Sequence, residues 1–66
     1  MKNYQHLSVK LLKDERDTLI CNIRSWENTL KGTSSILIKK YLEYAIRQAN
    51  EKIHAIDAEL FYRENH

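Results

Sequence analysis

The sequence has 66 residues, with eleven Lys or Arg against nine Asp or Glu, so its formal net charge is only +2. A chain of this length is expected to form one small domain, 1–66, and a charge so close to zero lacks the basic excess of a dedicated nucleic-acid-binding protein. No apolar run exceeds three residues, which argues against a membrane span and against the apolar centre of a signal peptide. We therefore expect a cytoplasmic protein with no membrane contact.

Residues 8–31 are predicted to form the first helix. Apolar side chains recur there at alternating steps of three and four residues, which is a heptad pattern with one charged interruption at Arg16. The members of this stripe are Val9, Leu12, Arg16, Leu19, Ile23, Trp26 and Leu30. Ser8 is a good N-cap, and Lys31 suits the last turn because a cation there interacts favourably with the helix dipole.

Residues 32–34 are predicted to form a turn. Gly32 is the only glycine, the chain has no proline, and three hydroxyl residues follow the glycine. We expect Gly32 to adopt the left-handed conformation that ends a helix, and Thr33, Ser34 or Ser35 to cap the next one. The alternative is a single long helix that tolerates the glycine, but this run of stop and start residues favours the turn.

Residues 35–62 are predicted to form the second helix, which makes the fold class all-α and the architecture an antiparallel two-helix hairpin. Ile38 extends the apolar stripe of this helix toward the turn. The other members of the stripe are Leu42, Ile46, Ala49, Ile53, Ile56 and Leu60. Ile23, Leu42 and Ile46 fall near the middle of the two stripes, so we expect all three to be buried.

The distribution of charge also favours an antiparallel arrangement. Residues 1–13 carry three lysines and no acid, whereas residues 51–66 are net acidic. A hairpin brings these two segments together at its open end, where opposite charges help to set the orientation of the helices.

A second apolar line runs along the second helix. It consists of Leu37, Tyr41, Tyr44, Ala55, Ala58 and Tyr62, with Gln48 and Glu51 as interruptions. One neighbouring helix cannot cover two faces, so part of this line is expected to need another contact. We expect a two-fold homodimer in which two hairpins form a four-helix bundle. Alternatively, the tyrosines lie half-buried with their hydroxyl groups in water.

Neither a disulfide nor a metal site is expected to stabilise so small a core. Cys21 is the only cysteine, so no disulfide can form within the chain, and it is expected to be a small semi-buried thiol because no base adjoins it on the helix. His6, His54 and His66 lack the paired short spacings of structural zinc sites. We expect neither a metal nor a cofactor.

Asp14, Glu15 and Asp17 form a charged cluster that could in principle ligate a metal or perform acid-base chemistry. Catalytic carboxylates must converge in a pocket, and a hairpin of two helices lying side by side does not provide one. We therefore expect these acids to form a solvated helix face, and we predict no enzyme. Arg16 lies on the apolar stripe. It is expected to extend its charged end to water or to pair with Glu51 or another acid nearby, in the hairpin or across a dimer.

Basic side chains gather near the turn, with aromatic residues close to them in the sequence. The basic patch consists of Lys31, Lys39, Lys40 and Arg47, and the aromatic residues are Trp26, Tyr41 and Tyr44. Such a combination can hold phosphates while bases stack on the rings, which keeps a nucleic-acid-binding regulatory hairpin as the alternative function.

The short chain, the segment RDTLICNIRSWENTLKG and the second helix rich in Lys and Tyr together resemble the small accessory proteins encoded in the early regions of lambdoid temperate phages. This resemblance implies a non-enzymatic protein that modulates host physiology or the choice between lysis and lysogeny by binding another macromolecule. It identifies no functional residue. The expected architecture is also similar to plasmid-encoded RNA-binding helical hairpins that dimerise as four-helix bundles, although a shared fold does not transfer function.

The leading expectation is a small regulatory interaction protein that acts through a helical surface on a host or phage protein. The residues expected to form the partner or dimer surface are Trp26, Leu37, Tyr41, Tyr44 and Tyr62.

Overall fold

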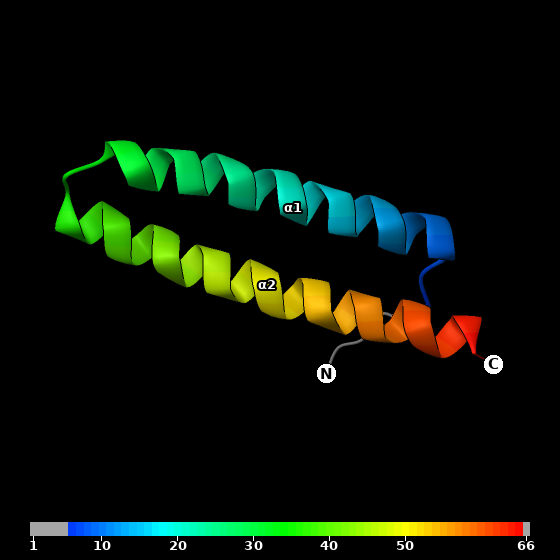
Figure 1. The fold of residues 1–66 in the computed structure, drawn as a ribbon. Helices are drawn as coiled ribbons and strands as arrows, with labels where there is room; N and C mark the ends of the chain where they lie inside the picture. Colours follow the sequence, from blue (N-terminus) through cyan, green and yellow to red (C-terminus); the bar gives the residue numbers. More distant parts are fainter. Residues whose placement is uncertain (1–5, 66) are drawn as a thin grey trace.

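A computed structural model of the chain describes residues 6–65, which form two α-helices joined by a short turn. Helix α1 spans Val9–Gly32 and helix α2 spans Ile36–Glu64. The helices lie side by side and run in opposite directions, so that the start of α1 and the end of α2 meet at the end opposite the turn (Figure 1). The described residues contain no strand, and the expected all-α hairpin is confirmed for them.

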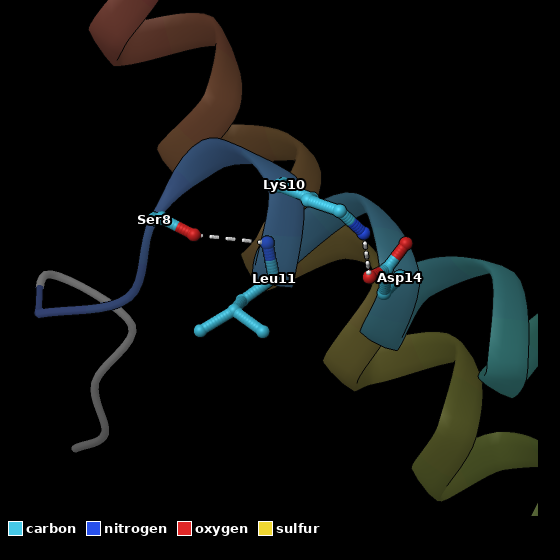
Figure 2. A network of polar contacts seen from close by, with 4 residues as sticks. All are labelled: Ser8, Lys10, Leu11 and Asp14. Carbon is cyan, nitrogen blue, oxygen red and sulfur yellow. Dashed lines mark hydrogen bonds and ion pairs between the residues drawn. The ribbon is translucent and has the colours of Figure 1, made fainter.

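Serine side chains begin both helices. The Oγ atom of Ser8 accepts a hydrogen bond of 3.1 Å from the backbone N–H of Leu11, as predicted for an N-cap (Figure 2). Ser35, one of the three expected candidates, caps α2 by accepting a 3.3 Å hydrogen bond from the N–H of Ile38. Each cap satisfies one of the backbone donors that a helix start leaves without an internal partner.

The end of α1 differs from the sequence-based expectation. Gly32 is the last residue of α1 and does not have a positive φ, so the predicted left-handed conformation is wrong. The chain leaves the helix instead through Thr33, whose φ of −102° and ψ of 143° are extended. The Thr33 hydroxyl then accepts a 3.2 Å hydrogen bond from the N–H of Ser35, which fixes the reversal without a left-handed residue. As a result, residues 33–35 form the turn.

The core is the seam between the two helices. Its buried cluster consists of Leu12, Leu19, Ala49, Ile56 and Leu60, with Leu7, Ile23, Trp26 and Ile53 packed against it and partly exposed. Leu42 is also buried, but it lies outside this cluster. Among the described residues, the two fully buried large side chains are Leu12 and Ile56, so burial is greatest toward the open end of the hairpin.

Some stripe residues are less buried than expected. Ile23 and Ile46 are half-buried, because they lie at the edges of a seam that only one neighbouring helix covers. Val9 and Ile38 are exposed near the ends of the stripes. Among the described residues, neither helix combines the length and the apolar character that crossing a bilayer requires.

Candidate functional site

An exposed apolar face runs the length of α2. We call it the aromatic face and define it by Leu37, Tyr41, Tyr44, Ala55, Ala58 and Tyr62. Leu37 is 81% exposed, Tyr41 70%, Tyr44 58% and Tyr62 59%. The residues follow one another at heptad spacing, and positions separated in this way share a side of a helix. Contiguous exposed apolar side chains on one side of a helix are a common feature of protein-binding surfaces.

A groove between the helices borders the turn-proximal half of the aromatic face. Trp26 and Leu19 of α1 form one wall, and the other wall comes from Tyr41, Tyr44, Ala45, Gln48, Ala49 and Lys52 of α2. The groove encloses about 210 Å³ and contains no acidic side chain. Trp26 packs against the core and is half-buried, so its indole is held in a fixed position at the edge of the surface.

A hollow lies on the distal half of the same face. Among the residues that the structure describes, Ala55, Ala58, Glu59 and Tyr62 line it, and its volume is about 550 Å³. The two alanines are the small side chains of this lining, and Arg63 donates a 2.7 Å hydrogen bond to Glu59. We call this feature the alanine hollow. The sequence pattern includes both alanines, but it does not indicate that they form a depression.

A second groove, which we call the Ile46 groove, was not predicted. It has a volume of 470 Å³ and is lined by Glu27, Leu30, Glu43, Ile46, Arg47, Asn50, Glu51 and His54. The sequence signal that could have indicated it is the position of Leu30 and Ile46 at the edges of their stripes, with acids one helical turn away.

The four residues of the expected basic patch, Lys31, Lys39, Lys40 and Arg47, are all exposed. Arg47 lines the Ile46 groove, whereas Trp26, Tyr41 and Tyr44 line the other one. In the Ile46 groove one guanidinium faces three carboxylates, so a phosphate bound by Arg47 would also meet negative charge.

An ion pair joins the two helices. Nη1 of Arg16 donates a 2.9 Å hydrogen bond to Oδ1 of Asp57, and the side chains are 31% and 53% exposed. This hydrogen bond raises the pKa of the Arg16 guanidinium above its usual value. Asp57 is therefore the acid that pairs with Arg16, whereas Glu51 lines the Ile46 groove.

The acidic cluster of α1 lies on the surface. Lys10 donates a 2.9 Å hydrogen bond to Asp14, as Figure 2 shows, and this bond raises the pKa of Lys10 above 10.5. Because the pKa of Lys10 is higher in the folded state, the contribution of this pair is present at neutral pH and is lost as the pH rises through the raised value. Glu15 and Asp17 are exposed, and residues 6–65 bring no three potential metal ligands together.

Cys21 and His54 are both on the surface. The expectation of a semi-buried thiol is wrong, because Cys21 lies on a side of α1 that α2 does not cover. His54 is exposed at the rim of the Ile46 groove. His66 lies outside the described residues.

Comparisons with protein-family models, with curated proteins and with solved structures found no match to this chain.

Proposed function

We propose that this protein is a small, non-enzymatic interaction protein that acts on a protein partner through the exposed surface of α2. The observation that supports this proposal is the aromatic face, whose Leu and Tyr side chains are more than half exposed along the whole helix. Aromatic side chains supply a disproportionate share of the binding energy at protein interfaces. Exposed aromatic side chains lower the solubility of a chain with so small a core. A contact that covers them with another protein removes this effect.

The proposed assembly is a cytoplasmic homodimer in which two hairpins form a four-helix bundle. The resemblance to early-region phage accessory proteins suggests a host or phage protein as the further partner, and the modulation of host physiology or of the choice between lysis and lysogeny as the outcome. In such a bundle the surfaces that remain outside, among them the Ile46 groove, are available to the further partner.

Charge favours a protein partner over a nucleic acid. Arg47 shares its groove with Glu27, Glu43 and Glu51, and these carboxylates repel a phosphate backbone. The groove beside Tyr41 and Tyr44 has Lys52 as its only charged side chain among the lining residues. An apolar protein segment can occupy this groove without burying an unpaired acid.

Photo-crosslinking in cells tests the proposal. A photoreactive phenylalanine analogue replaces Tyr41, and a matched control carries it at Ile36, which is 69% exposed but lies off the aromatic face. We expect protein adducts from position 41 that persist after nuclease treatment and that the Tyr44→Ala substitution removes. The control position should give few of them.

The alternative function, nucleic-acid binding, is tested by the salt dependence of binding. If Lys39, Lys40 and Arg47 bind phosphates, changing all three to Gln should reduce the salt dependence of nucleic-acid binding by about one unit of slope for each lost contact. Sub-micromolar, sequence-selective binding at physiological salt that disappears in this triple variant would favour the nucleic-acid-binding hairpin over the proposed function.

A further inference from the structure

We infer that the aromatic face of α2 binds the same face of α2 in a second copy of the chain, with the two helices antiparallel and the two-fold axis between residues 49 and 50. The inference rests on the proposed function, because it assigns a partner to the same surface. The two α2 helices then form the middle of an open four-helix array with each α1 outside, and this arrangement replaces the closed bundle of the proposed assembly.

Side-chain size supports this pairing. In an antiparallel heptad pair, each residue of the line lies opposite one from the other end of the second helix. With the axis between residues 49 and 50, the opposed pairs are Leu37 with Tyr62, Tyr41 with Ala58, Tyr44 with Ala55, and Gln48 with Glu51, each made twice. Every ring on the turn-proximal half therefore faces an alanine, and interfaces pack well when large and small residues alternate in this way.

The alanine hollow provides the space that these rings require. Its lining among the described residues includes Ala55 and Ala58, and its volume is about 550 Å³. In the inferred pairing, Tyr41 and Tyr44 of the second copy enter this hollow. Large side chains on one half of the face thus meet small ones on the other half, which suits a self-complementary two-fold contact.

The charges of α2 support the antiparallel direction. The half from 36 to 49 carries Lys39, Lys40 and Arg47 against one acid, Glu43, for a net charge of +2. The half from 50 to 64 carries a net charge of −2, from Glu51, Asp57, Glu59 and Glu64 against Lys52 and Arg63. Antiparallel pairing brings opposite charges together, whereas parallel pairing would bring like charges together.

The distribution of charge along α2, basic in its first half and acidic in its second, opposes the helix dipole of a single α2. The first turn of the helix has no acidic residue and contains Lys39, although the positive end of a helix dipole is stabilised by acids. The acidic end of a second α2, lying alongside, supplies the missing negative charge. The charge pattern is therefore better suited to the pair than to the single helix.

The centre of the pairing fixes the register. Gln48 lies opposite Glu51 of the second copy, and the amide can donate a hydrogen bond to the carboxylate. A shift by one heptad in either direction leaves part of the line without an opposed residue. A polar pair in an otherwise apolar line is a common way to specify one register.

A size exchange between Tyr44 and Ala55 tests the inference. Sedimentation equilibrium should give a dimer for the full chain, and Tyr44→Ala should raise the dissociation constant by about tenfold or more because a buried ring is lost. Ala55→Tyr should weaken the dimer similarly, since it places a second ring opposite the ring of Tyr44 from the other copy. The double variant restores a ring opposite an alanine, so its dissociation constant should return to within a few-fold of the parent value.

Two controls accompany this exchange. Ile36→Ala removes an equally exposed apolar side chain that lies off the aromatic face and should leave the dissociation constant unchanged. Circular dichroism should show the same helix content for all variants, because Tyr44 and Ala55 are both exposed in the single hairpin.

Spin labels measure the direction and the register. In a Cys21→Ser background, a label at Lys52→Cys should be about 8 Å along the helix axis from its copy, whereas a label at Lys40→Cys should be about 28 Å from its copy. A parallel pair would give short distances at both positions and would overturn the inference. So would a double variant that is weaker than both single variants.

The tests separate this inference from the proposed function. A chain that stays monomeric at all concentrations, but forms Tyr44-dependent adducts with other proteins in cells, would overturn self-pairing and leave the proposed function intact. Rescue by the double variant together with the two label distances supports the inference, whether or not a further protein is captured.

Discussion

Gly32 is a helical residue with room for a side chain. A Cβ atom added to it would meet nothing within 4 Å, and its φ is not positive. Gly32→Ala should therefore raise the free energy of unfolding by about 0.4–1 kcal/mol, because alanine restricts the unfolded chain without straining the helix. In a domain of this size that corresponds to a melting temperature roughly 2–8 °C higher.

Thermal melts followed by circular dichroism at one fixed protein concentration would measure the effect of Gly32→Ala. Thr33→Ala is the matched control, since it removes the hydroxyl that holds the N–H of Ser35 and should lower the melting temperature. A Gly32→Ala variant that melts below the parent would indicate a left-handed residue at this position after all.

Two isoleucines of α2 differ in burial although both lie on the apolar stripe. Ile56 is fully buried, whereas Ile46 is half-buried at the wall of the Ile46 groove. Ile56→Ala should reduce the free energy of unfolding by about 2–5 kcal/mol, which is a large part of the total for so small a domain. Ile46→Ala should cost clearly less, because less apolar area returns to water. Urea unfolding of both variants would compare them, and equal losses would contradict the burial described here.

The ion pair between Arg16 and Asp57 acts at the scale of the two helices. Because both side chains are partly exposed, its contribution depends on salt. A double-mutant cycle with Arg16→Gln and Asp57→Asn should give a favourable coupling energy that falls as the Debye length is shortened from about 30 Å at 0.01 M salt to about 3 Å at 1 M.

The pair formed by Lys10 and Asp14 is the control for this cycle, since it lies within α1 and bridges no helices. Its removal should alter helix content slightly without changing how α1 packs on α2. A coupling between Arg16 and Asp57 that does not change with salt would show that the two residues act through packing and not through charge.

The helices and their seam could be predicted from the sequence because both depend on local geometry. Heptad spacing determines which residues share a face, and Ser8 and Ser35 have the side chains that capping requires. Burial at the edges could not be predicted, since Ile46 and Leu42 look alike in the stripe and differ only in what the neighbouring helix covers. The conformation of Gly32 depended on Thr33, whose hydroxyl offers a second way to reverse the chain.

The candidate site was predicted in part. The exposed line of Leu37, Tyr41, Tyr44 and Tyr62 follows from its spacing, and these residues are exposed in the structure. Arg47 follows Tyr44 by three residues, a spacing that makes them neighbours on the helix surface, yet Arg47 lines the Ile46 groove and Tyr44 lines the other groove. The grooves themselves depend on how α1 lies along α2, which no local pattern specifies.

At the scale of the whole molecule, the proposed dimerisation through the aromatic face predicts that stability depends on protein concentration. If two hairpins associate, the folded dimer is favoured by mass action, and the melting temperature should rise as the protein concentration is raised across the micromolar range. The Tyr44→Ala variant should lose most of this rise. Melts at a series of concentrations would measure it, and a constant melting temperature together with a monomer in sedimentation would contradict dimerisation.

The fully buried side chains lie far from the turn, and this affects how the chain folds. Contacts beside the turn close the shortest loops and are the easiest to form, but that end of the hairpin holds only half-buried or exposed apolar side chains apart from Leu42. The largest burial of apolar area comes last, when Leu12 packs with Ile56 and Leu60 at the open end of the hairpin. A hairpin closed only near its turn therefore has little to hold it together, and zipping should proceed through a single late barrier with no populated half-closed state.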